Sequence, residues 1–259
     1  MDALETLAEK ASHLSGELAS QYVIGSGNFG LTQYTVWMFI CMAVVLLVVL
    51  VASKRLTMIP TGKFASLVEY GYDFVRKDIS EGVIGHGYKK HVPFLASLFF
   101  FILISNFIGL IPGCKTPTGT ISVTWVLALL SFVYFIGCGV KAHGSWGYIK
   151  SLAPSGLPVI MVPIIWVLEF ISTIMRALTL AVRLYGNMFA GHMVIGIFCL
   201  ATSIFMGAAI QNFVMAVPGV LWFVILLCMY ALELLVAFLQ AYIFTILSAV
   251  YISLATSEH

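Results

Sequence analysis

Five stretches of apolar residues alternate with polar segments along this chain, and each is long enough to cross a bilayer. The first three cover residues 34–52, 92–111 and 121–140. About 20 apolar helical residues span the roughly 30 Å hydrocarbon core of a membrane. The sequence therefore predicts an all-α polytopic membrane protein. Residues 1–33 are expected to form a polar tail before an uncleaved first span, and residues 34–259 a single membrane domain.

The last two apolar stretches are too long for ordinary spans. At 1.5 Å per residue, residues 157–206 would form a helix of about 75 Å and residues 212–256 one of about 67 Å. Each stretch is therefore either two short spans or one strongly tilted helix, and hydropathy does not choose between seven spans and five. Polar residues and then Pro218 separate the two stretches, which would allow a tilted hairpin over residues 157–256.

Residues 63–82 show a different, amphipathic pattern. Charged residues occupy one face of a helix drawn through them, and apolar residues recur on the other at i, i+3, i+4 and i+7 spacing. The apolar positions are Phe64, Leu67, Val68, Gly71, Phe74 and Val75. This pattern predicts a helix that lies on the membrane surface. A soluble helix that caps the ends of the spans is the alternative.

The basic residues indicate how the chain is oriented. Lys54 and Arg55 follow the first span, and five more basic residues lie between residues 58 and 90. Because short cytoplasmic loops carry an excess of Lys and Arg, this segment is expected on the cytoplasmic or matrix side, with the N-terminus outside. The turn at residues 114–120 holds one charge, Lys115, which fits an outside loop.

Composition excludes several classes of protein. Hydrophobic residues make up 61% of the chain and charged residues 9%, whereas soluble domains carry about 25% charged residues. The formal net charge of +2 gives no indication of nucleic-acid binding. The five cysteines are scattered without CxxC or other metal-ligand spacing, and the chain contains no P-loop, HExxH or GxSxG motif. The sequence therefore predicts no metal, no cofactor and no catalytic site of its own.

Arg183 is the residue that points most directly to a function. A guanidinium stays protonated in proteins, and at the centre of a bilayer it costs about 2.5–3.5 kcal/mol on the insertion scale. At 100° per residue, one helix face would hold Arg183 together with Glu169, Arg176, Thr179, Gly186, Asn187 and Ala190. Small residues beside an arginine allow another helix to approach closely, which suggests a partner surface. Snorkelling, a buried carboxylate pair and ordinary packing within one subunit are the alternatives.

Other polar residues at membrane depth suggest a path for protons. His192 would face away from Arg183, about 13 Å further along the helix, and Glu233 and Gln240 share a face of the last helix. Histidine and glutamate can both exchange protons near neutral pH when their surroundings shift them. An isolated histidine that is simply hydrogen-bonded is the alternative for His192.

Several separate motifs resemble subunit a of F-type ATP synthases, the stator subunit that faces the rotating c ring. They are Arg-Leu-Tyr-Gly-Asn-Met-Phe-Ala-Gly-His at 183–192, Ile-Ser-Asn-Phe-Ile-Gly-Leu-Ile-Pro-Gly at 104–113, Thr-Pro-Thr at 116–118, Val-Thr at 123–124, Leu-Gln-Ala-Tyr-Ile-Phe at 239–244 and Ser-Glu-His at 257–259. The resemblance covers residues 35–259 in order. It implies five spans plus a surface helix, with the last two spans forming a tilted hairpin, and places the C-terminus on the side of Lys54 and Arg55.

The resemblance also implies roles for individual residues. Arg183 would be the essential stator arginine, Gln240 its neighbour across the hairpin and Asn187 the asparagine one turn on. Arg176 and Glu169 match channel positions, and His192 with Glu233 matches the coupled pair of the proton path. Gly109 stands where some members have an aspartate, so no proton role is expected there.

The expected function is to form two proton half-channels against the c ring and to couple proton flow to rotation through Arg183. Partners would be the c ring, b-type stator stalk subunits and the soluble F1 sector. The location would be an energy-transducing membrane, with a bacterial plasma membrane favoured over a mitochondrial inner membrane. A proton-coupled secondary transporter and a structural subunit of a respiratory complex are the alternatives. The sequence leaves open whether protons or sodium ions are carried.

Overall fold

The computed structural model describes residues 22–24, 31–54, 63–85, 87–111, 114–144, 146–147, 161–211 and 216–256. Most of the predicted tail at 1–33, Arg55 and the last residues 257–259 lie outside these ranges. Before the first span, strands β1 (Tyr22–Ile24) and β2 (Leu31–Thr32) form a short antiparallel pair.

Helices account for almost all of the described chain, which confirms the predicted all-α membrane fold. Five of them are long and apolar enough to cross a membrane. They are α2 (Gln33–Lys54), α5 (Val92–Gly109), α6 (Ile121–His143), α8 (Val162–Gln211) and α9 (Ala216–Thr256). The described parts of the two long stretches, residues 162–211 and 216–256, each form one continuous helix, so the described chain holds five helices of spanning length and not seven.

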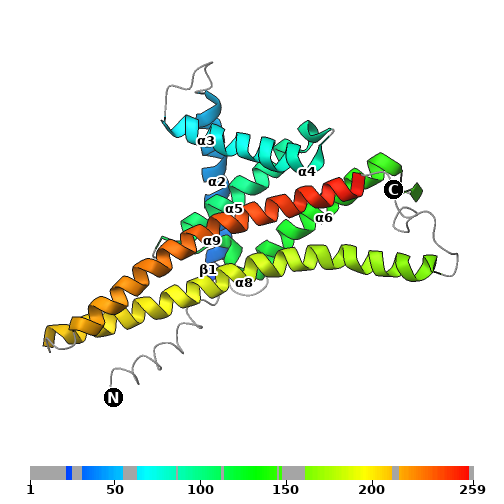
Figure 1. Ribbon diagram of the computed structural model, residues 1–259. Helices are drawn as coiled ribbons and strands as arrows, with labels where there is room; N and C mark the ends of the chain where they lie inside the picture. The colour runs from blue at the N-terminus through cyan, green and yellow to red at the C-terminus, as the bar shows by residue number, and fades with distance from the viewer. Residues whose placement is uncertain are drawn as a thin grey trace.

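The two long helices form an antiparallel hairpin that crosses the rest of the molecule (Figure 1). With 50 residues, α8 is about 75 Å long, and the hairpin runs at a large angle to α2. Helix α5 packs against α9, and α6 packs against both members of the hairpin. Buried apolar side chains at this crossing, among them Phe99, Ile102, Leu184 and Phe244, form one core.

The amphipathic segment is a helix with an irregular second half. Helix α3 (Lys63–Phe74) continues through a π-helical turn (Val75–Glu81) into α4 (Gly82–Ile84). Val75 and Ile79 are fully buried, whereas Leu67, on the predicted apolar face, is 70% exposed. The segment therefore packs on the bundle through its C-terminal half. That α3 lies on a membrane surface stays a prediction.

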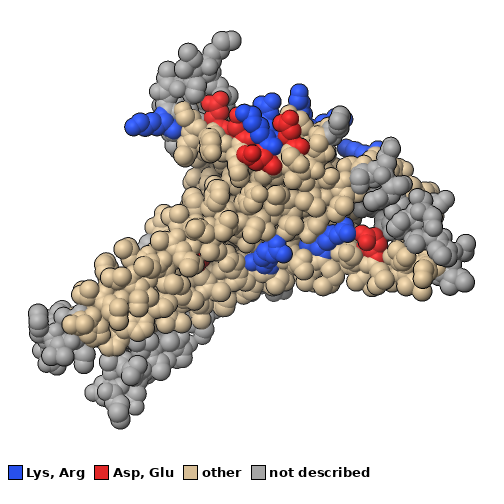
Figure 2. Space-filling view, viewed as in Figure 1, with Lys and Arg blue, Asp and Glu red and all other residues tan. Residues whose placement is uncertain are grey.

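Charged side chains gather over α3 and the segment after it, on one side of the molecule (Figure 2). Lys77 donates a 2.9 Å hydrogen bond to Asp73 there. This bond lowers the pKa of the Asp73 carboxyl and raises the pKa of the Lys77 ammonium. The visible face of the hairpin is mostly uncharged apart from a few groups along α8, so those few groups define the candidate site.

Candidate proton-path site on the hairpin

Contacts between α8 and α9 fix the register of the hairpin. The pairs are Phe205 with Trp222, Phe198 with Trp222, Gly191 with Glu233, and Arg176 with Tyr251, whose ring centroid lies 5.8 Å from the guanidinium carbon. Arg183 is eight residues before Gly191, and Gln240 is seven residues after Glu233. The antiparallel register therefore puts Arg183 and Gln240 at the same level of the hairpin.

The face of α8 that carries Arg183 points out of the molecule. Thr179, Arg183, Gly186 and Ala190 are all exposed along this stripe. The opposite face is buried in the core through Leu180, Ala181, Leu184 and Met188. Within the described ranges, Arg183 makes neither an ion pair nor a hydrogen bond. The structure thus presents an unpaired guanidinium among small residues on an open surface.

Two amide side chains lie near the level of Arg183 and face the helix bundle: Asn187 on α8 and Gln240 on α9. Asn187 is half-buried, and its amide nitrogen Nδ2 is fully buried without a hydrogen-bond partner among the described residues. Gln240 on α9 is 5% exposed. Both residues therefore place a polar amide inside the bundle near the level of Arg183.

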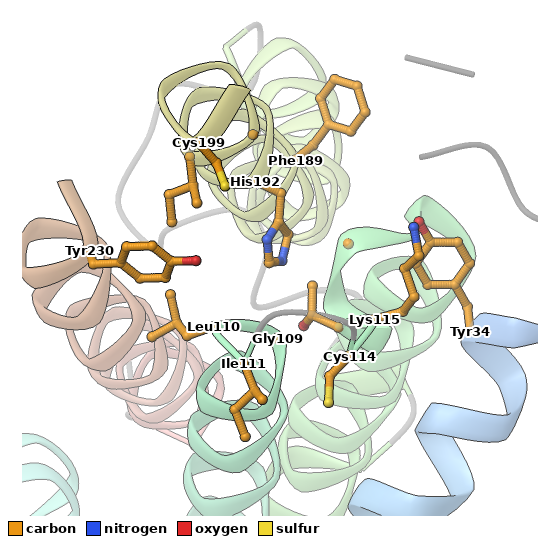
Figure 3. A pocket seen from close by; sticks show the side chains of 14 residues that line it. Tyr34, Gly109, Leu110, Ile111, Cys114, Lys115, Phe189, His192, Cys199 and Tyr230 are labelled. Atoms are coloured by element: carbon orange, nitrogen blue, oxygen red, sulfur yellow. The ribbon is translucent and has the colours of Figure 1, made fainter. Parts of the chain in front are cut away.

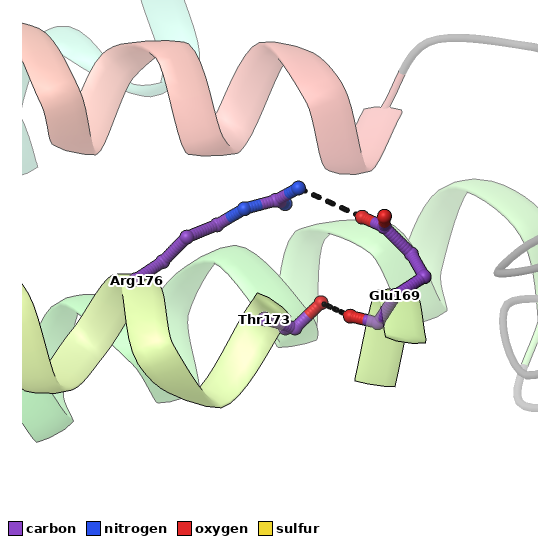
Figure 4. Close-up of polar contacts among 3 residues, drawn as sticks. All are labelled: Glu169, Thr173 and Arg176. Atoms are coloured by element: carbon purple, nitrogen blue, oxygen red, sulfur yellow. Dashed lines mark hydrogen bonds and ion pairs between the residues drawn. The ribbon is translucent and has the colours of Figure 1, made fainter. Parts of the chain in front are cut away.

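Glu169 and Arg176 form an ion pair near the start of α8 (Figure 4). Arg176 donates from a guanidinium nitrogen to Glu169 Oε1 at 2.7 Å. The Arg176 side chain is 25% exposed and the Glu169 side chain is 40% exposed. Thr173 donates from its hydroxyl to the Glu169 backbone carbonyl at 2.7 Å, within the same helical turn. The two charged groups are seven residues apart, so Arg176 must extend along the helix to reach the carboxylate.

Glu233 lies on α9 beside Gly191 of α8, and it makes no ion pair with any described residue. It is 5% exposed and packs on Gly191, where any larger side chain would collide with its carboxylate. Its Oε1 atom and the Nε2 atom of His192 are buried, and neither has a hydrogen-bond partner among the described residues. The structure brings His192 and Glu233 to adjacent positions of the hairpin but not into a direct hydrogen bond.

His192 faces a cavity of about 260 Å³ at the end of α5 (Figure 3). Its walls come from α2, the α5–α6 turn, α8 and α9. The side chains labelled in Figure 3 include Tyr34, Cys114, Lys115, Phe189, Cys199 and Tyr230. Glu233 is not among the lining residues, so the cavity reaches His192 but not the carboxyl group.

A buried polar network behind this cavity was not predicted as part of the site. Thr116 donates to the Ser105 carbonyl at 3.0 Å and lies 2.8 Å from the Thr118 hydroxyl. Thr118 lies 2.7 Å from Asn106 Oδ1, and Asn106 donates from Nδ2 to the Ala237 carbonyl of α9 at 3.2 Å. Ala237 is one helical turn after Glu233, so the network ties the turn after α5 to the polar part of the hairpin.

Two glycines permit the close approaches on which this arrangement depends. Gly191 admits Glu233, as described above. A side chain at Gly109 would collide with Thr116, and its Cβ atom would lie 3.2 Å from His192 Nε2. The signal for the network was present in the sequence, because its members belong to the motifs at 104–113 and 116–118. Only the structure shows that they meet.

No group of three or more His, Cys, Asp and Glu side chains that could hold a metal ion occurs in the part of the chain that the structure describes.

Comparisons with known proteins identify the family of the chain. The family described as ATP synthase A chain matches residues 35–253. The chain belongs to the ATP synthase A chain family. Proteins named ATP synthase subunit a include one from Chloroherpeton thalassium that is 40% identical over 243 residues, covering 91% of this chain and 69% of the relative. One from Rhodobacter capsulatus is 39% identical over 221 residues, covering 85% and 90%.

Family membership establishes the coarse function and confirms the resemblance drawn from the motifs. The chain is a subunit of the membrane sector of an F-type ATP synthase, and proton transport follows from the family. It works in a complex with other subunits. Its five apolar helices place it as a multi-pass protein in an energy-transducing membrane.

Proposed function

We propose that the α8–α9 hairpin forms two proton half-channels against a c ring and couples proton flow to rotation through Arg183. The observation that carries this proposal is the outward-facing stripe of Thr179, Arg183, Gly186 and Ala190, in which the guanidinium has no ion-pair partner among the described residues. A permanent charge facing lipid is costly. A c-ring carboxylate that arrives deprotonated would supply the missing counter-charge.

The two polar groups on either side of Arg183 support separate half-channels. His192 and Glu233, with the cavity, lie towards the end of α5, where the turn holding Lys115 is expected outside. Glu169 and Arg176 lie near the start of α8, on the side expected inside. Arg183 stands between them, and its fixed positive charge would repel protons moving directly from one group to the other. Protons would then cross only on the rotating carboxylates.

The partners follow from the same surfaces. The small-residue stripe fits a ring of close-packed helices, and we assign it to the c ring. The b-type stalk subunits and the soluble F1 sector would complete the complex, with ATP chemistry on F1. We place the protein in a bacterial plasma membrane, in keeping with the bacterial relatives.

The central test replaces Arg183 in the assembled synthase. Arg183→Ala should reduce ATP-driven acidification of inverted vesicles to background, while detached F1 still hydrolyses ATP. Arg183→Lys should rescue poorly, because an ammonium lacks the planar fork and loses its proton more readily when desolvated. Arg176→Gln is the comparison variant: it removes an arginine two turns earlier that already has a carboxylate partner, and it should lose much less flux than Arg183→Ala. Near-normal pumping by Arg183→Ala would refute the proposal.

Two cysteines of the natural sequence line the cavity and allow a test of the side of the membrane from which it is reached. Cys114 and Cys199 line the cavity together with His192. A membrane-impermeant thiol reagent should label them from the outer side of the membrane and not from the F1 side. Labelling from the F1 side alone would reverse the assignment of the two half-channels.

A further inference from the structure

Tyr251 of α9 meets the Arg176 guanidinium across the hairpin. The guanidinium carbon lies 5.8 Å from the centre of the tyrosine ring, within the roughly 6 Å at which a cation is attracted to the face of an aromatic ring. This contact is separate from the ion pair, because Arg176 reaches Glu169 through a guanidinium nitrogen at 2.7 Å. Arg176 therefore has one partner on its own helix and one on α9.

The Tyr251 ring is also packed against the core of the bundle. Its centroid lies 5.8 Å from that of Phe135 on α6. Phe135 is 3% exposed and packs edge to face on Phe132, with the two ring centroids 5.2 Å apart. The next residue on α9, Ile252, is fully buried. Because close-packed side chains are confined to few rotamers, Tyr251 presents a fixed ring to the arginine.

The ion pair alone constrains Arg176 weakly. Glu169 is seven residues earlier, about 10 Å along the helix axis at 1.5 Å per residue, so the arginine side chain extends along α8 to reach it (Figure 4). A long side chain loses much rotamer freedom when it is held in one geometry, and a partly exposed ion pair barely offsets that cost. A second contact, with a fixed ring, supplies the missing restraint.

The restraint matters because a second arginine lies nearby. Arg176 and Arg183 are seven residues apart and so share a face of α8, and the charges of both act on the Tyr251 phenol. A mobile guanidinium two turns from Arg183 would bring a second positive charge towards the surface proposed for the c ring. Holding Arg176 on Glu169 keeps the two charges in separate places.

We propose that Tyr251 is a positioning residue of the inner half-channel, whose ring holds the Arg176 guanidinium on Glu169 and away from Arg183. The role of the half-channel rests on the proposed function, but the contact itself can be tested without proton flow. Tyr251 acts on flux through Arg176, and the part that acts is the ring and not the hydroxyl.

The test combines substitutions at Tyr251 and Arg176 in the whole synthase. Tyr251→Phe keeps the ring, whereas Tyr251→Leu and Tyr251→Met remove it, and each is made alone and together with Arg176→Gln. The first measurement is the initial rate of ATP-driven acidification of inverted vesicles. The second is the labelling of Glu169 by a water-soluble carbodiimide and an amine, read by mass spectrometry, since the guanidinium covers the carboxylate oxygen that it binds.

Tyr251→Phe should match wild type in both measurements. Tyr251→Leu should raise the labelling of Glu169 and lower flux by about two- to fivefold, the range that a partly exposed cation–π contact gives. Neither Tyr251→Leu nor Tyr251→Met should add to the effect of Arg176→Gln, because the group that the ring positions is already gone.

Tyr242→Leu is the matched control. Tyr242 is another partly buried tyrosine of α9, and its ring centroid lies 5.7 Å from that of Phe74. Since its described ring contact is to a phenylalanine and not to an arginine, the effect of Tyr242→Leu on flux should be the same with and without Arg176→Gln.

Three results would overturn the inference. They are unchanged labelling in Tyr251→Leu, equal losses from Tyr251→Phe and Tyr251→Leu, and a loss from Tyr251→Leu that persists in full together with Arg176→Gln. If Tyr251→Leu does not assemble, Tyr251→Met decides by the same criteria. Normal pumping by Arg183→Ala would instead overturn the proposed function and leave the labelling result as it stands.

Discussion

The two carboxylates of the hairpin lie in opposite surroundings. Glu169 is 40% exposed and holds Arg176 at 2.7 Å. Glu233 is 5% exposed, and its Oε1 atom has no hydrogen-bond partner within the described ranges. The same contrast separates two histidines, because His91 Nδ1 lies 3.1 Å from the Tyr134 hydroxyl while His192 Nε2 has no such partner.

The difference indicates which groups can exchange protons. A buried polar group left without a partner costs about 1–3 kcal/mol, so folding stability does not account for Glu233 and His192. Glu169 is paired with Arg176, whereas Glu233 Oε1 and His192 Nε2 have no hydrogen-bond partner among the described residues, and His192 lines a cavity large enough to hold water. We therefore expect the proton-exchanging chemistry of this subunit to concentrate at the unpartnered pair.

The largest effect is expected from exchanging His192 and Glu233, the two groups that lack hydrogen-bond partners among the described residues. His192→Glu should slow ATP-driven proton flux by about a hundredfold, the lower range for losing a proton-transferring group, because two carboxylates would then repel each other. Exchanging both, His192→Glu with Glu233→His, should restore more flux than either single substitution, since one imidazole and one carboxyl remain in the path. The measurement is the initial rate of acidification in inverted vesicles. Strictly additive losses would show that the two groups act separately.

A smaller effect is expected from the network that supports Glu233. Asn106→Leu removes the donor to the Ala237 carbonyl and the acceptor that faces Thr118. Bonds of this kind between membrane helices contribute about 0.6–2 kcal/mol. We expect a lower unfolding midpoint of the detergent-solubilised subunit and a several-fold loss of flux.

Thr120→Val is the control for that substitution, because the bond that the Thr120 hydroxyl makes among the described residues stays within its own turn, to the Pro117 carbonyl. An equal loss from both substitutions would mean that the network contributes no more than any other buried polar contact.

The sequence predicted the architecture well and the contacts of the site only in part. Hydropathy placed all five spans, because apolar length is a local property. It did not decide between one and two helices for residues 157–206, since that depends on what packs against them. The orientation of Arg183 followed from helical periodicity, which also put Leu184 and Met188 on the other face. The network through Asn106 was missed because it joins residues 131 positions apart, at Ala237, and no local pattern reports such a contact.

The part of the hairpin that carries the Glu169–Arg176 ion pair should tolerate substitution better than the part that carries His192 and Glu233. Arg176→Gln leaves Glu169 partly exposed to water, so we expect a loss of flux below tenfold, in line with the 0.2–1 kcal/mol or so of a partly solvated ion pair. The double substitution Glu169→Gln with Arg176→Gln should recover part of that loss, because it removes the uncompensated carboxylate. The check is the same vesicle assay. A loss as deep as that of His192→Glu would contradict the contrast between paired and unpartnered groups.

The smallest expected effect concerns His91, the partnered histidine, which lies just before the span that begins at Val92. Burial, followed by the charge of Lys90, lowers the pKa of His91. A lowered pKa means that the unfolded chain binds more protons than the folded one, so stability is retained above the unfolded value of about 6.5 and falls as the pH drops through it. His91→Gln keeps a group able to bond Tyr134 but does not titrate, so it should reduce the difference in unfolding midpoint between pH about 5 and pH about 8. Because His91 is partly exposed, the change should be slight, and proton flux at neutral pH should hardly differ from wild type. An unchanged pH dependence would show that His91 is already solvated and that burial does not hold it in the neutral form.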